Sequence, residues 1–120
     1  METKEFFKHW EVKYPISFFE FKKYICDYYI NNDETNKKFY ENIMSFEIIP
    51  LVIAEALITK INIFLQKFYY SLFLYRDYDL SNNPFYYYKI YYKNEQISRC
   101  DDDYLCAALE CLYYLEKQLS

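Results

Sequence analysis

Residues able to carry nucleophilic or acid–base catalysis are few in this chain. His9 is the single histidine among 120 residues, and it stands beside Trp10 in a short segment with helical spacing. Every serine or cysteine triad would have to use this one imidazole as its base. No serine or cysteine near His9 in the sequence suggests such a triad. We therefore expect no enzymatic activity.

The cysteines lack the spacing of a metal or redox site. Structural zinc sites place their ligands two to four residues apart, whereas Cys106 and Cys111 would point about 140° apart on a helix. No Cys-x-x-Cys pair occurs. The four thiols are expected to be reduced and mostly buried, with no cofactor bound: Cys26, Cys100, Cys106 and Cys111.

Asp101, Asp102 and Asp103 form the one cluster of acids. A divalent cation would need further acids from elsewhere in the fold, such as Asp77 and Asp79. Consecutive acids also suit a helix N-terminus, where the dipole favours negative charge. We expect these residues to cap a helix instead of binding metal.

The chain has no glycine but contains 17 tyrosines and 11 phenylalanines. Phosphate-binding loops need glycine where the backbone approaches a ligand or takes positive φ, so P-loop and Rossmann sites are excluded. AT-rich codons explain part of the aromatic excess, since lysine outnumbers arginine 12 to 2. The net charge of −4 argues against non-specific duplex binding. The N-terminus lacks a signal sequence, and Glu55 and Lys60 interrupt the longest apolar stretch, so we expect a cytoplasmic protein without a membrane partner.

The first half of the chain, residues 1–61, has mainly helical patterning. Ser17 and Glu20 have the spacing of a capping box, and Pro50 suits the first turn of a helix. Apolar residues recur at helical spacing between these signals. Helices are predicted over residues 4–13, 18–30, 34–44 and 50–61.

The second half predicts a β-hairpin or meander over residues 63–100 and a helix over 102–119. Aromatic and β-branched residues from 63 onwards favour a strand, although a helix continuing through Arg76 fits the same run. Further strands are predicted over 85–92 and 97–100, with turns between them. The predicted fold is a single α+β domain in which N-terminal helices and a C-terminal helix flank an antiparallel sheet of two or three strands.

One face of this sheet is the candidate binding surface. If Tyr86, Tyr88, Ile90 and Tyr92 face the helices, the alternate residues face outwards. Tyrosines interleaved with lysines are typical of stacking platforms for single-stranded RNA, and tyrosine is also favoured at protein interfaces. A helix lying over this face would remove the surface. The predicted binding residues are Lys67, Tyr69, Tyr75, Tyr87, Lys89, Tyr91 and Lys93.

The predicted C-terminal helix opens with a spaced set of residues, Tyr104, Ala107, Cys111 and Leu112, and the aromatic strand 85–92 precedes it. In this pattern residues 46–119 resemble small proteins of phages and mobile elements from AT-rich bacteria, whose final helix has similar spacing. Cys111 stands where those sequences usually carry glycine. The shared pattern is one of packing and brings no catalytic residue with it.

The resemblance implies a mobile-element accessory protein. Together with the small, acidic and motif-free chain, it predicts a non-catalytic phage or mobile-element protein that binds and inhibits a host protein or ribonucleoprotein complex. An anti-CRISPR-type inhibitor of a defence nuclease or its guide-RNA complex is the most concrete form. Aromatic side chains would then dock on the target and block its assembly. Two alternatives remain open, a single-stranded RNA-binding module that uses the Tyr/Lys face and an immunity protein that neutralises a toxin. The oligomeric state is also left open.

Overall fold

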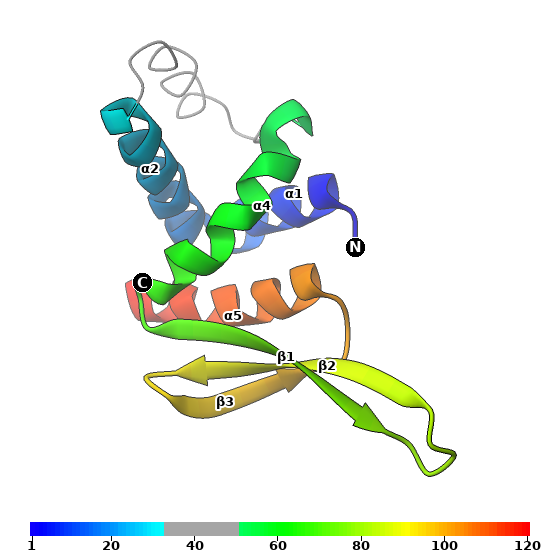
Figure 1. Ribbon diagram of the computed structural model, residues 1–120. Coiled ribbons are helices and arrows are strands. Elements are labelled where there is room, and N and C mark those ends of the chain that lie inside the picture. Colours follow the sequence, from blue (N-terminus) through cyan, green and yellow to red (C-terminus); the bar gives the residue numbers. More distant parts are fainter. Residues whose placement is uncertain (33–50) are drawn as a thin grey trace.

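The computed structural model describes residues 1–32 and 51–120 and has the predicted α+β class. The helix predicted over 34–44 lies outside the described residues, as does Pro50. Figure 1 shows the helices above a three-stranded sheet, and its labels are used here. In chain order the elements are α1 (Thr3–Lys13), α2 (Pro15–Asn32), α4 (Leu51–Gln66), β1 (Tyr70–Tyr78), β2 (Pro84–Tyr92), β3 (Glu95–Cys100) and α5 (Tyr104–Leu119). No described helix is long and apolar enough to cross a membrane.

The core between the helices is built largely from aromatic rings. Trp10 of α1 is fully buried, and its ring centroid lies 4.6 Å from that of Phe21 in α2 and 6.0 Å from that of Phe64 in α4. Phe6 and Phe7 are also fully buried beside Trp10. This cluster fixes the three N-terminal helices against one another, because Trp10, Phe21 and Phe64 each contact rings from the other two helices.

The predicted capping box at Ser17 is wrong, because α2 already begins at Pro15. Ser17 lies buried in the first turn of α2, where its hydroxyl accepts a hydrogen bond from Trp10 Nε1 at 2.8 Å. The backbone N–H groups of Ile16 and Ser17 donate to the carboxylate of Glu116 in α5, at 3.0 and 2.8 Å. An acid 100 residues away thus satisfies the free amides of this helix N-terminus.

The helix–strand boundary falls inside the run that sequence reasoning assigned to a strand from residue 63. α4 continues to Gln66, since Leu57, Ile61 and Phe64 recur at helical spacing and are all buried. β1 begins only at Tyr70. Tyr69 makes the turn between them with a φ of 70°, a left-handed conformation that a chain without glycine must give to another residue.

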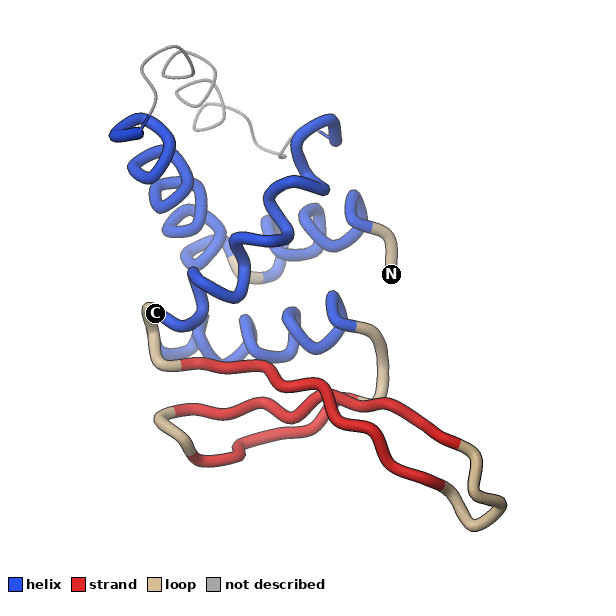
Figure 2. Tube along the Cα trace, in the orientation of Figure 1, coloured by secondary structure: helices blue, strands red, loops and turns tan. Residues whose placement is uncertain are grey.

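The sheet is antiparallel with the order β1-β2-β3. β1 and β2 pair over their whole length, from Tyr70 opposite Tyr92 to Tyr78 opposite Pro84. β3 is shorter and pairs only with the part of β2 from Tyr88 to Tyr92, with an irregularity between Ile90 and Tyr91. The end of the β1–β2 hairpin therefore extends beyond the third strand (Figure 2).

α5 packs across one face of the sheet and holds it to the helices. Ala107, Ala108 and Leu112 are fully buried. The hydroxyl of Ser98 in β3 donates a hydrogen bond to Glu110 of α5. This contact ties the edge strand to the helix and shows which face of β3 points inward.

Asp103 caps α5, as its place in the acid cluster predicts, since its Oδ1 accepts a hydrogen bond from the backbone N–H of Cys106 at 2.9 Å. Hydrogen bonds from the N-terminal amine and then from Cys106 lower the pKa of Asp103 below its ordinary value of 3.8. We expect Asp103→Ala to reduce the free energy of unfolding at pH 7 by about 1 kcal/mol. Urea denaturation followed by circular dichroism measures this difference.

The effect of Asp103→Ala should depend on pH. A carboxyl whose pKa is lowered on folding stabilises the protein above its unfolded-state pKa, and this contribution is lost as the pH falls through the folded-state pKa. The difference between wild type and Asp103→Ala should therefore shrink as the pH is lowered below 3.8. Glu95→Ala, which removes an exposed acid from β3, is the control. A difference that stays constant down to the lowest pH would contradict the capping role of the ionised carboxylate.

Candidate partner-binding surface

Along most of β2, alternate residues face the helices and the outer side of the sheet, as the sequence predicts. Ile90 is fully buried, and the ring of Tyr88 lies 5.9 Å from that of Tyr104 in α5. Tyr92 packs against the same core. The alternate residues of β2 point to the opposite face, and Figure 2 shows the described helices on one side of the sheet only. The outer face is thus left open by every helix that the structure describes.

A set of aromatic and basic side chains, here called the cation–aromatic face, covers the outer side of the sheet. The rings of Tyr75 and Tyr87 stack with centroids 5.8 Å apart, and the hydroxyls of Tyr75 and Tyr91 lie 3.3 Å apart. The hydrogen bond with Tyr75 raises the pKa of Tyr91, so the Tyr91 phenol is protonated at neutral pH. The face comprises Phe73 and Tyr75 of β1, Tyr87, Lys89 and Tyr91 of β2, and Arg99 of β3.

The two cations of this face lie over its rings. Lys89 Nζ is 4.3 Å from the ring centroid of Tyr75, and Arg99 Cζ is 3.9 Å from that of Tyr87. The Asp101 carboxylate holds Arg99 in place through its Nε at 2.6 Å, and this hydrogen bond raises the pKa of Arg99. Tyr87 is only 8% exposed as a result of this cover and its strand neighbours. Cations therefore lie over two of the rings of this face, those of Tyr75 and Tyr87.

Three of the predicted binding residues lie elsewhere. Lys67 follows α4, and its Nζ lies 4.7 Å from the ring centroid of Tyr24 in α2, so its prediction as part of the outer sheet face is wrong. The prediction failed because it started the strand region at residue 63, whereas β1 begins at Tyr70. Tyr69 and Lys93 form a separate pair, in the turns that precede β1 and follow β2. Lys93 Nζ lies 5.7 Å from the ring centroid of Tyr69, and the backbone N–H of Lys93 donates a hydrogen bond to the Tyr69 carbonyl at 3.0 Å.

Sequence reasoning missed the far end of the β1–β2 hairpin. Beyond Tyr88 the hairpin has no third strand beside it, and Figure 1 shows it extending away from the helices. This segment, residues 76–86, is here called the projecting hairpin. Four large apolar side chains are exposed on it: Tyr78, Leu80, Phe85 and Tyr86. The length mismatch between β2 and β3 was the only available signal, because the exposed residues look like core residues in the sequence.

The tip of the projecting hairpin has a defined conformation. Asp79 Oδ1 accepts hydrogen bonds from the backbone N–H groups of Ser81 and Asn83, both at 2.9 Å. Asn82 supplies the left-handed position with a φ of 63°, one of the two asparagines predicted for it. Leu80 is fully exposed at the apex of this turn. Such a turn presents an apolar side chain to a partner without the entropic cost of ordering a loop.

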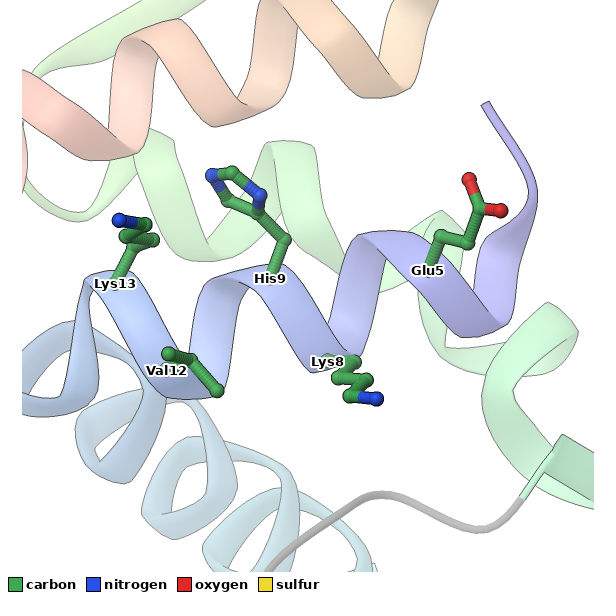
Figure 3. A pocket seen from close by; sticks show the side chains of 5 residues that line it. All are labelled: Glu5, Lys8, His9, Val12 and Lys13. Atoms are coloured by element: carbon green, nitrogen blue, oxygen red, sulfur yellow. The ribbon is translucent and has the colours of Figure 1, made fainter.

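The groups with catalytic or metal-binding potential lie apart from this surface. His9 lines a shallow pocket of about 290 Å³ with Glu5, Lys8, Val12 and Lys13, all from α1 (Figure 3). The His9 ring lies 6.2 Å from the ring of Tyr14, measured between centroids. None of the residues that line this pocket is a serine or a cysteine.

The acids at the start of α5 lie close to one thiol. Asp102, Asp103 and Cys106 place their polar atoms within 4.8 Å of one another. Burial, followed by a hydrogen bond with Asp103, raises the pKa of Cys106 to about 12, so this thiol stays protonated at neutral pH. A protonated thiol is a poor metal ligand, and the Asp103 carboxylate already accepts hydrogen bonds from the N-terminal amine and from Cys106. The four cysteines, all within the described residues, form no disulfide, and Cys26 and Cys111 are buried.

Comparisons with known proteins give no relative for this chain. No family model matches it, and neither a curated protein nor a solved structure matches it.

Proposed function

We propose that this chain is a small non-catalytic protein that binds and inhibits a host macromolecular complex through its projecting hairpin. One observation carries the proposal: a conformationally defined hairpin presents four exposed apolar side chains beyond the three-stranded part of the sheet. Three of the four are tyrosine or phenylalanine residues, namely Tyr78, Phe85 and Tyr86. Aromatic side chains of this kind are the usual anchors of protein interfaces.

The geometry of the outer face favours a protein partner over single-stranded RNA. A base binds such a sheet by stacking on an open ring face. Here Lys89 and Arg99 lie over Tyr75 and Tyr87, so a base would first have to displace these cations. A protein partner needs no such displacement, because it can dock on the hairpin and pair acidic groups with Lys89 at the margin.

The resemblance of residues 46–119 to phage and mobile-element proteins supports a defence complex as the target, most concretely a CRISPR nuclease or its guide-RNA complex. Inhibition would be steric. The projecting hairpin would enter a groove that the target needs for assembly or substrate entry, and the helical body would block the remainder. The aromatic hot spots provide the affinity, and no group of the inhibitor reacts.

A plating assay tests this proposal. The chain is expressed in hosts that each carry one CRISPR type directed against a phage, and the efficiency of plating is measured. We expect the chain to restore plating in at least one host, and Leu80→Asp to abolish the effect. Val12→Asp changes another exposed apolar residue, on α1, and should retain the effect. Absence of restoration in every host, together with salt-dependent binding of single-stranded RNA that is lost on Tyr91→Ala, would reject the inhibitor and favour the RNA-binding module.

A further inference from the structure

The two edges of the sheet differ in their protection against strand pairing. β3 is a short edge of six residues with an irregular register, and it carries Glu95 and Arg99. Charges, short length and bulges are the features by which proteins block unwanted pairing. β1 has nine residues in continuous register with β2, and its two charges, Arg76 and Asp77, both lie towards the hairpin tip. Residues 70–75 carry no charge, so β1 is the less protected edge.

We propose that β1 pairs with β1 of a second copy of this chain, antiparallel across a two-fold axis at Leu74. The two sheets would then form one continuous sheet of six strands. An isologous interface of this kind uses the same surface patch on both copies. The inference does not depend on the proposed function, because the dimer leaves Leu80, Phe85 and Tyr86 of the projecting hairpin uncovered.

The register at Leu74 is the one that pairs the whole of β1 without opposing like charges. It places Phe73 beside the partner's Tyr75, on the outer face, and Tyr70 beside the partner's Tyr78. Arg76 lies opposite the partner's Leu72, and Asp77 lies opposite the partner's Ser71. An axis at Arg76 or at Asp77 would instead bring two identical charges together, which is destabilising for directly opposed residues.

The size of the interface predicts a reversible dimer. About half of each of the side chains of Phe73, Leu74 and Tyr78 is exposed. At roughly 200 Å² for a large side chain, pairing would cover about 300 Å² of side-chain surface per copy, besides the backbone edge. A standard stable interface covers about 800 Å² per partner. The dimer should therefore dissociate on dilution.

Sedimentation velocity of the purified chain over a wide concentration range tests the proposal. We expect the average mass to rise from the monomer mass of 15.0 kDa towards twice that value as the concentration increases. Leu74→Lys places two ammonium groups at the axis and should raise the dissociation constant at least about tenfold. Tyr86→Lys makes a comparable change on β2, away from the edge, and should leave the dimer intact. A monomer mass at every concentration, or an unchanged dimer with Leu74→Lys, would overturn the proposal.

Disulfide trapping tests the register without relying on a disruptive variant. Leu74→Cys places two thiols opposite each other at the axis, so mild oxidation should give a covalent dimer. Leu80→Cys is more exposed but lies at the hairpin tip, so it should cross-link more slowly. The wild-type chain, with its four native thiols, gives the background. Equal rates for Leu74→Cys and Leu80→Cys would exclude the two-fold axis at Leu74.

Discussion

Replacing Trp10 with alanine is expected to lower the free energy of unfolding by about 3–5 kcal/mol. The indole is fully buried between α1, α2 and α4 and contacts Phe21 and Phe64 directly. Its removal leaves a cavity that three helices cannot close without moving. It also removes the hydrogen bond that Trp10 Nε1 donates to the buried hydroxyl of Ser17. A loss of this size is a large fraction of the stability of a domain of this length.

Two further variants separate packing from hydrogen bonding at Trp10. Trp10→Phe keeps most of the aromatic contact and should cost less than Trp10→Ala. Ser17→Ala removes the hydrogen bond and leaves the indole in place, at a cost of about 1–3 kcal/mol because the indole N–H is then buried without its partner. Urea denaturation measures all three. A cost below about 1 kcal/mol for Trp10→Ala would show that the indole is not a central part of the core.

Changing Leu80 and Tyr86 to aspartate together is expected to weaken binding to the inhibited complex by at least about 30-fold. A single interface hot spot contributes about 2 kcal/mol or more, which corresponds to that factor. Leu80 is fully exposed and Tyr86 is 55% exposed, so neither change should affect folding. Titration calorimetry with the purified complex from the plating assay measures the affinity.

Val12→Asp is the matched control for the hairpin variant, because Val12 is 67% exposed on α1 and lies outside the hairpin. Circular dichroism should give the same spectrum for both variants and the wild type. If Leu80→Asp/Tyr86→Asp keeps full affinity while Val12→Asp loses it, the binding surface lies on the helical body and the assignment of the hairpin is wrong.

Sequence patterns located the elements of the fold where local signals were strong. Uninterrupted helical spacing placed α2 and α5, and turn residues located the hairpin tip and the β2–β3 turn. Period-two alternation also separated Tyr88 and Ile90 from Tyr87 and Lys89. That separation was enough to bring four of the predicted binding residues together on one face: Tyr75, Tyr87, Lys89 and Tyr91.

The errors arose where non-local contacts decide the structure. Ser17 has the spacing of a capping box, but Glu116 of α5 satisfies the free amides of α2. Lys67 stands in a run that is apolar all round, so its period could not tell a strand from a helix. The projecting hairpin depends on β3 ending opposite Tyr88, and strand pairing of this kind cannot be read from either strand alone.

Site-specific photo-crosslinking tests most directly whether this chain binds its target through the projecting hairpin. A photoreactive amino acid replaces Leu80 at the tip in one variant and Val12 on α1 in another. Each variant is irradiated with the complex that the chain inhibits. We expect a covalent adduct with one subunit of that complex from position 80 and none from position 12. An adduct from position 12 with none from position 80 would contradict the account.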